Sequence, residues 1–324
     1  MKNNEYFMKE ALKEAQKGLN KTFPNPAVGC VIVKNGKIIA KGYHKKAGEP
    51  HAEIEALKQI DFNAEDCDIY VTLEPCNHYG KTPPCTEAII KSGAKRVFVS
   101  VKDPNPRVNG SGIKRLRESG IEVETDILKE EGEEVLKYFS FQIKNKLPFI
   151  TLKAALSLNG FINKRKGERT FLTGKEAYEY TLELRKRHDA VLVGGNTVFT
   201  DNPRLRGVKK IILTNRNLPN ELNIFKSDDE VFIYKRQNIE EILKDLYSKG
   251  IGSILVEGGG EIFNQFIERG FFNEIVVYYA PLLFSLSNER TPFYDGLKDI
   301  SDLEIKEVKK LGNDVMIIYR RRGK

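Results

Sequence analysis

One histidine and two cysteines constrain this chain more than any other feature. His51 begins a helical pattern, and a short strand pattern follows at residues 69–73. Cys76 and Cys85 come next, each directly after a proline, and a second helical pattern begins at Cys85. We expect all three side chains to lie at helix starts, where free N–H groups and the helix dipole favour thiolates. To bring them together, the chain must fold with these helices beside one strand.

The residue types predict a catalytic zinc site. One neutral imidazole and two thiolates balance the charge of Zn²⁺ and leave the fourth tetrahedral position open, as in catalytic zinc sites. Glu53, two residues after His51, is expected to carry protons and not to bind the metal. This order of histidine, glutamate and Pro-Cys is typical of zinc-dependent base deaminases. The alternatives are a closed structural zinc site, with His78 as candidate fourth ligand, and a cysteine pair without metal.

Length and composition limit the other classes of protein. The 324 residues are typical of two domains, and a hydrophobic content of 40% is sufficient for packed cores. No run of eighteen apolar residues and no secretory signal pattern occur, so we expect no membrane span and a cytoplasmic protein. Four cysteines in so long a chain indicate metal ligands in a reducing compartment. The net charge of +8 fits dispersed, solvated lysines, or a preference for nucleic acid or phosphorylated ligands.

Alternating strand and helix patterns predict two α/β units. Residues 1–145 predict an α/β/α layered domain, with a helix at 50–60 that has proline in its first turn and a last helix at 137–146. Residues 147–324 repeat the alternation and end in a hairpin. Glycines follow two of its strands, at Gly194-Gly195 and Gly258-Gly259-Gly260, and the second group begins a helix. Such turns bind phosphates, although they are also common without any ligand.

The segment from Cys76 to Cys85 points to a particular family. It is longer and more basic than the usual base-deaminase signature, which has two residues between the cysteines. With its His-Ala-Glu, Glu-Pro-Cys and Thr-Pro-Pro-Cys, the sequence resembles the bacterial bifunctional riboflavin-biosynthesis deaminase–reductases. The resemblance spans roughly residues 4 to 320. It implies a cytidine-deaminase-like three-layer α/β/α domain at 1–145 and a dihydrofolate-reductase-like α/β domain at 147–324.

The resemblance implies two successive reactions. The first half would deaminate 2,5-diamino-6-(5-phosphoribosylamino)pyrimidin-4-one hydrolytically, with one Zn²⁺ per chain on His51, Cys76 and Cys85 and with Glu53 as the catalytic residue. The second half would use NADPH to reduce the ribosyl group of 5-amino-6-(5-phosphoribosylamino)uracil to ribityl. The implied partners are phosphorylated pyrimidines, not nucleic acid or membrane. A homo-oligomer, dimer or tetramer, is also implied.

The family pattern implies further contacts at matching positions. The deaminase substrate contacts would be Asn25, His44, His78, Lys81, Asp103 and Asn105. The cofactor contacts would be Ala155, Phe171, Thr173, Thr197, Asp201, Gly259, Gly260, Glu261, Ile262, Phe263, Asn264 and Gln265. The reductase substrate contacts would be Lys153, Arg169, Arg185, Leu205, Arg206 and Glu257.

Some positions depart from the family pattern. Asn159 stands where aspartate is usual, Phe171 replaces a tryptophan, and Arg169 replaces a small hydroxyl residue. These departures motivate one alternative, in which the second domain is a ligand-sensing or structural module. The other alternative is a nucleic-acid or free-base deaminase with a non-catalytic second domain. Cys30 lies in a strand pattern and is expected to be a buried core residue.

Overall fold

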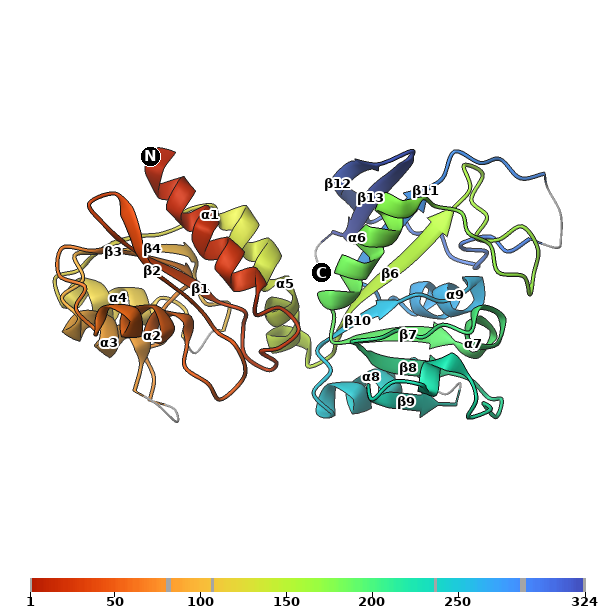
Figure 1. Ribbon diagram of the computed structural model, residues 1–324, viewed down its shortest axis with the longest axis horizontal. Coiled ribbons are helices and arrows are strands. Elements are labelled where there is room, and N and C mark those ends of the chain that lie inside the picture. Colours follow the sequence, from red (N-terminus) through yellow and green to blue (C-terminus); the bar gives the residue numbers. More distant parts are fainter. Residues whose placement is uncertain (1, 80–82, 106–107, 236–237, 286–289, 323–324) are drawn as a thin grey trace. The chain divides into compact units, whose positions relative to one another are not determined.

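The computed structural model describes residues 2–79, 83–105, 108–235, 238–285 and 290–322. It divides into two compact units, Met1–Lys146 and Leu147–Lys324 (Figure 1). Both are α/β, so the fold class expected from the sequence is confirmed. Among the described residues, no helix has the length and apolar character needed to cross a bilayer.

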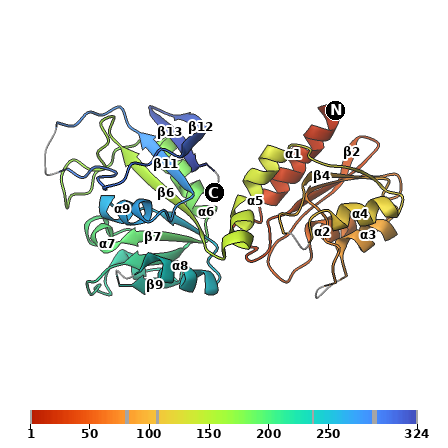
Figure 2. The same ribbon diagram turned by 180° about the vertical axis from the view of Figure 1, so that it is seen from behind.

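The first unit is a five-stranded sheet between two helical layers. Its strand order is β2-β1-β3-β4-β5, with β1 antiparallel to both neighbours and β3, β4 and β5 parallel. The strands are β1 (Gly29–Lys34), β2 (Lys37–Tyr43), β3 (Asp68–Leu73), β4 (Arg96–Val101) and β5 (Glu122–Glu124). The helices are α1 (Lys2–Gln16), α2 (Ala52–Leu57), η1 (Lys58–Ile60), α3 (Cys85–Lys91), α4 (Ser111–Glu118) and α5 (Lys129–Asn145). Figures 1 and 2 show α1 and α5 on one side of this sheet and α2, α3 and α4 on the other.

Alternation along β1 explains the two layers. Val31 and Val33 pack with α1, whereas Cys30 and Ile32 pack on the opposite face with the helices that carry the predicted ligands. Cys30 is fully buried, as predicted. These two cores hold the sheet and helices in place.

Two helix predictions need correction. The last helix of the first unit, α5, begins at Lys129 and not at 137. Its first two turns are mostly exposed, so the apolar period is weak there, and Gly132 packs where a Cβ would lie 2.3 Å from the Ser100 hydroxyl. Pro50 lies before the N-cap of α2 rather than in its first turn.

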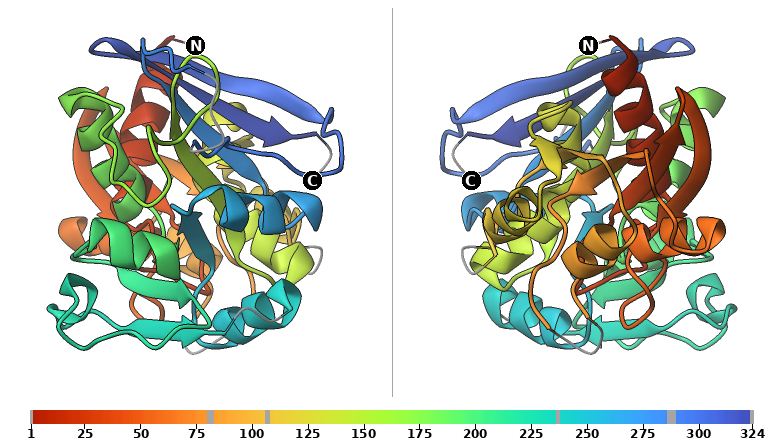
Figure 3. Two further views of the ribbon diagram at one scale, coloured as in Figure 1. Left: turned by 90° about the vertical axis from the view of Figure 1, so that its right-hand side faces the viewer. Right: turned by 90° about the vertical axis from the view of Figure 1, so that its left-hand side faces the viewer.

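The second unit is an eight-stranded sheet in the order β12-β13-β11-β6-β10-β7-β8-β9. The block from β11 to β9 is parallel, and the β12–β13 hairpin pairs with it antiparallel (Figure 3). The strands are β6 (Phe149–Leu156), β7 (Ala190–Gly194), β8 (Lys209–Leu213), β9 (Val231–Tyr234), β10 (Ser253–Val256), β11 (Glu274–Tyr279), β12 (Leu303–Leu311) and β13 (Asp314–Arg321). The helices are α6 (Lys175–Lys186), α7 (Gly195–Asp201), η2 (Asn223–Phe225), α8 (Ile239–Ser248) and α9 (Gly260–Glu268).

Helices cover both faces of the parallel block. The buried side chains of α8 and α9 pack on one face, and those of α6 and α7 pack on the other. In such sheets, ligands bind beyond the carboxyl ends of the strands. Both α7 and α9 begin just after a strand at this edge, on opposite faces of the sheet.

Candidate functional site

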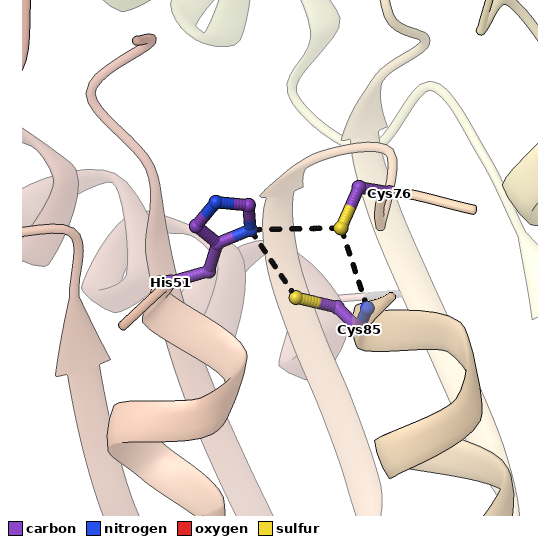
Figure 4. A group of neighbouring side chains, drawn as sticks. All are labelled: His51, Cys76 and Cys85. Atoms are coloured by element: carbon purple, nitrogen blue, oxygen red, sulfur yellow. Dashed lines mark hydrogen bonds between the residues drawn. The ribbon is translucent and has the colours of Figure 1, made fainter. Parts of the chain in front are cut away.

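The three predicted metal ligands lie together in the first unit (Figure 4). The His51 Nδ1 atom is 3.3 Å from Cys85 Sγ and 3.6 Å from Cys76 Sγ. A tetrahedral zinc with ordinary bonds separates a nitrogen from a sulfur ligand by about 3.6 Å, so this donor set fits zinc in both chemistry and spacing. His51 is the N-cap of α2 and Cys85 begins α3, as expected. Cys76 does not lie at a helix start, because β3 runs into a loop there.

The local contacts favour a thiolate at the loop cysteine. Hydrogen bonds with Cys85 and His51 lower the pKa of Cys76 to about 4, despite its burial. The backbone N–H of Cys85 also donates to this sulfur at 3.3 Å. In turn, the hydrogen bond to Cys76 raises the pKa of His51 to about 9. The group therefore carries a negative sulfur around which a cation can bind.

Glu53 lies next to the ligands but is not part of the set. It is in the first turn of α2, and only 3% of it is exposed. Burial raises the pKa of Glu53 to about 7, with the charge of Cys76 acting in the same direction and that of His51 opposing it. The carboxyl group also interacts with Cys85. A buried carboxyl group beside three donors has the position of a proton carrier.

His44 and Asn25 form one wall near the cluster. The ring of His44 is buried and packs edge-on to His51 at 5.3 Å between centroids. Its Nδ1 lies 3.0 Å from the Pro50 carbonyl oxygen and its Nε2 lies 3.1 Å from the Asn25 amide nitrogen. Because a carbonyl only accepts, Nδ1 carries the proton and Nε2 accepts from Asn25. Burial lowers the pKa of His44, so the ring is neutral.

A loop after β4 brings Asp103 to the same site. Burial raises the pKa of Asp103, and the charges of His78 and Cys76 also act on it. Its Oδ1 accepts from the backbone N–H of Asn105 at 2.8 Å. His78 is exposed, and Lys81 lies outside the described residues.

Glu74 organises this loop, and sequence reasoning missed it. Its buried carboxylate accepts four backbone N–H groups: those of Asp103, Gly110, Gly112 and Ile113. Gly112 packs so close to the chain before Cys76 that a Cβ would lie 2.1 Å from the Pro75 oxygen. The glutamate therefore ties the strand end that carries Cys76 to the loop that carries Asp103. The Glu-Pro-Cys motif was the only available signal.

A cavity of about 670 Å³ lies beyond the strand ends of the second unit. It is lined by residues of or after β6, β7 and β10 and by the segment 162–172. The predicted contacts that line it are Lys153, Ala155, Arg169, Arg185, Thr197, Asp201, Leu205, Glu257 and the run 259–264. Those that do not line it are Phe171, Thr173, Arg206 and Gln265. Phe171 is 78% exposed, with the guanidinium of Arg169 stacked on it at 4.4 Å.

Glycines shape the cavity at the start of α9. A Cβ on Gly258 would lie 2.6 Å from Cβ of Ile262, and one on Gly260 would lie 2.7 Å from the Pro292 oxygen. Beside Gly259 there is open space, and this N-cap residue has no side chain with which to cap the helix. Within this first turn, the Ile262 N–H donates to the Gly259 carbonyl at 3.0 Å, and the positive end of the helix dipole favours an anion beside Gly259.

Three charged side chains face one another elsewhere in the cavity. Arg185 binds Glu257 through two hydrogen bonds, Nε to Oε1 at 2.7 Å and Nη2 to Oε2 at 2.8 Å. Burial acts to raise the pKa of Glu257, but the bonds from Arg185 and the charge of Lys153 outweigh it and lower that pKa. Burial lowers the pKa of Lys153, whose Nζ lies 5.2 Å from the centre of the Tyr278 ring.

Comparison with known proteins identifies the family. The cytidine and deoxycytidylate deaminase zinc-binding region matches residues 1–101, and the RibD C-terminal domain matches residues 148–317. A riboflavin biosynthesis protein RibD from Bacillus amyloliquefaciens is 37% identical, over 97% of this chain and 95% of its own length. The chain belongs to the RibD family. RibD from Aquifex aeolicus is 38% identical, over 97% of this chain and 98% of its own length.

Solved structures in the RibD family agree with this membership. RibD of Acinetobacter baumannii, form 1, has a TM-score of 0.85 and 32% identity, with 99% of each chain covered. A Thermotoga maritima diaminohydroxyphosphoribosylaminopyrimidine deaminase/5-amino-6-(5-phosphoribosylamino)uracil reductase has a TM-score of 0.88 and 33% identity, with 99% of each covered. The chain is thus a deaminase–reductase of the riboflavin pathway by family. The second half matches a RibD domain, which favours this function over a nucleic-acid deaminase.

One departure from the RibD pattern has a structural explanation. The Asn159 side chain pairs with the backbone of Phe284: its amide nitrogen donates to the carbonyl at 2.6 Å, and its oxygen accepts the N–H at 3.2 Å. The same oxygen accepts from the Ser157 hydroxyl at 2.9 Å. Aspartate has no donor for the carbonyl, so an amide suits this position.

Proposed function

We propose that His51, Cys76 and Cys85 hold one Zn²⁺ and that the first half deaminates 2,5-diamino-6-(5-phosphoribosylamino)pyrimidin-4-one. The proposal is supported by family membership and by a ligand spacing that matches zinc. When bound, zinc acidifies water and so makes hydroxide available near neutral pH. The single observation that carries the proposal is this donor set with a buried, non-ligand Glu53 beside it.

We assign proton transfer to Glu53. Hydrolytic removal of an exocyclic amine requires that a proton leave the attacking water, reach the ring nitrogen and later reach the departing ammonia. Glu53 is the buried carboxyl group adjacent to the ligands, so one residue can serve each transfer. Asn25, His44, Asp103 and Asn105 would hold the substrate, and we retain His78 and Lys81 as further contacts from the family pattern.

We propose that the second half reduces the ribosyl group of the uracil product with NADPH. The cavity would align C4 of the nicotinamide with C1 of the sugar, which is the main requirement of hydride transfer. Ala155, Thr197, Asp201 and the run 259–264 would hold the cofactor, with the N-terminus of α9 beside its phosphates. Phe171, Thr173 and Gln265 would act only if they move toward the cavity, which they do not line.

The charged group in the cavity fits the sugar-phosphate substrate. Arg185, Leu205 and Glu257 line it, and Arg169 offers a second guanidinium. Arg206 is exposed and outside the lining, so its predicted contact needs a rearrangement. Reduction also needs a proton donor, and we assign this role to Lys153, which lines the cavity, interacts electrostatically with Glu257 and has its pKa lowered by burial.

The test uses purified, zinc-loaded protein and the diaminopyrimidine substrate. Without NADPH, mass spectrometry should show replacement of the amine by a carbonyl; with NADPH, a further gain of two hydrogens. Glu53→Gln should retain zinc, lose ammonia release by a factor of at least about 10², and still reduce the uracil intermediate. Glu55→Gln, on the same helix but paired with Lys45, is the control. Loss of zinc from the Glu53 variant would refute the assigned role.

Localisation and assembly stay predictions. We propose a cytoplasmic protein that forms a homo-oligomer, a dimer or tetramer. Light scattering coupled to size-exclusion chromatography measures the oligomeric state directly. A monomer at micromolar concentration would contradict the proposed homo-oligomer.

A further inference from the structure

Arg216 is a cation near the cavity whose side chain is held by an aromatic ring and an amide oxygen. It follows β8, and its guanidinium carbon lies 3.9 Å from the centre of the Phe199 ring. Its Nη1 lies 3.4 Å from the Asn196 side-chain oxygen, and its backbone N–H donates to the Thr214 hydroxyl at 3.1 Å. Phe199 and Asn196 both belong to α7, so the arginine is held against that helix.

The charge of this arginine is uncompensated. Within the part of the chain that the structure describes, no carboxylate forms an ion pair with Arg216, whereas Arg185 is paired with Glu257 and Arg96 with Asp68. A guanidinium held in place by stacking, with donors still free, binds phosphate well because less side-chain freedom is lost on binding. The position is therefore suited to an anionic group of a ligand.

The sheet order indicates which group that is. The cavity runs from Ala155 on β6, past the glycines after β10, to Gly194 and Asn196 at the end of β7. A dinucleotide with its nicotinamide at Ala155 and its pyrophosphate at Gly259 therefore continues toward β7 and then β8. Neighbouring strands are about 4.8 Å apart, so β8 lies about 14 Å from β6. At this far end, Asn196 both lines the cavity and contacts Arg216.

Arg216 does not itself line the cavity but contacts the lining residue Asn196, whereas Arg169 lines the cavity and contacts the other end of α7. Arg169 donates to the backbone oxygen of Asp201, the last residue of that helix, at 3.4 Å. A helix of seven residues is about 10 Å long. The two arginines thus contact different parts of α7, and Arg216 is the one that follows β8 in the chain.

We propose that Arg216 binds the 2′-phosphate of NADPH and thereby makes the second half select NADPH over NADH. The inference rests on the proposed use of a nicotinamide cofactor. The two nucleotides differ only in that phosphate, so the strength of this contact sets their difference in affinity. Stacking on Phe199 presents the guanidinium edge, which can donate two parallel hydrogen bonds to phosphate oxygens.

The test compares binding, without substrate or turnover. NADPH and NADH are titrated by their fluorescence into wild-type protein, Arg216→Gln, Arg216→Lys and the control Arg187→Gln. Arg187 is also exposed and stacked over an aromatic ring, Tyr180, but it follows α6 and not β8, whereas Arg216 contacts the lining residue Asn196. Calorimetry with 2′,5′-ADP and 5′-ADP repeats the comparison on the adenosine half alone.

The expected result is a Kd for NADPH raised about 10- to 100-fold in Arg216→Gln. The Kd for NADH should be unchanged, Arg187→Gln should match wild type, and Arg216→Lys should be intermediate. An unchanged Kd for NADPH in Arg216→Gln, or equal weakening of both nucleotides, overturns the inference while leaving NADPH use intact. Wild-type protein that binds neither nucleotide overturns the proposed reductase function and this inference with it.

Discussion

Replacing Glu74 by glutamine tests whether one carboxylate holds the substrate loop of the first half. Each of its oxygens accepts one short and one longer hydrogen bond: Oε1 from Gly112 at 2.9 Å and Ile113 at 3.3 Å, and Oε2 from Gly110 at 2.9 Å and Asp103 at 3.2 Å. Glutamine keeps one oxygen and turns an NH₂ group toward the other two donors. Two backbone N–H groups thus lose a charged acceptor.

The loss of stability in Glu74→Gln can be estimated from those two hydrogen bonds. Hydrogen bonds to charged groups contribute about 1.5–3 kcal/mol each, so the variant should lose about 3–6 kcal/mol. A domain is stable by about 5–15 kcal/mol, so it should still fold. The change loosens the loop that carries Asp103 but alters none of the three zinc ligands. The KM for deamination should therefore rise more than kcat falls.

Amide hydrogen exchange of the zinc-loaded protein measures the loss of local stability in the segments that Glu74 binds. Peptides that span α4 should exchange about two to four orders of magnitude faster in Glu74→Gln, as about 3–6 kcal/mol implies. Glu118→Gln makes the same change at an exposed position of α4, where its ion pair with Lys114 spans 3.8 Å, and should have almost no effect. Exchange in Glu74→Gln within tenfold of wild type would refute the assigned role.

Three other changes give distinct outcomes. Asn159→Asp places a carboxylate against the Phe284 carbonyl and should lower the free energy of unfolding of the second unit by about 1–2 kcal/mol. Urea denaturation measures this change, and an unchanged free energy of unfolding contradicts the pairing. Burial raises the pKa of Asp189 from 3.8 to about 6, so its folded form resists ionisation and stability falls as pH rises across that window. Asp189→Asn keeps an oxygen for Gly252 and Ser253, so it should stabilise the unit by about 1–3 kcal/mol above pH 7 and have no such effect below pH 4. Removal of zinc by a chelator should abolish ammonia release and lower the melting temperature of the first unit. NADPH-dependent reduction of the uracil intermediate should continue. Equal loss of ammonia release and of reduction would contradict separate sites.

The sequence was most informative where chemistry and periodicity coincide. His51 and Cys85 could be placed at helix starts because each follows a proline and precedes or begins a helical pattern, whereas the loop position of Cys76 was not predicted. The strands could be predicted because buried positions alternate or form short apolar runs, as at β1 and β7. Most of the predicted reductase contacts line the cavity because they follow strand ends, which meet at one edge of a parallel sheet.

Long-range contacts could not be predicted in this way. Glu74 binds backbone groups 29 to 39 residues away, and no local pattern records such an arrangement. The stack of Arg216 on Phe199 depends on two segments that approach only when β7 and β8 pair. Phe171 was placed in the cavity by its position in a family motif, whereas its orientation depends on the conformation of the surrounding loop.

The pairing of Arg185 with Glu257 affects how an anionic ligand is taken up. Both nitrogens of this fork are already bound to carboxylate oxygens, at 2.7 and 2.8 Å. A phosphate that takes these same two nitrogens must therefore displace one anion with another, so uptake at this position is an ion exchange. The cost of separating the internal pair is subtracted from the affinity for the phosphate. The same carboxylate returns when the ligand departs, which favours rapid release of product over tight retention.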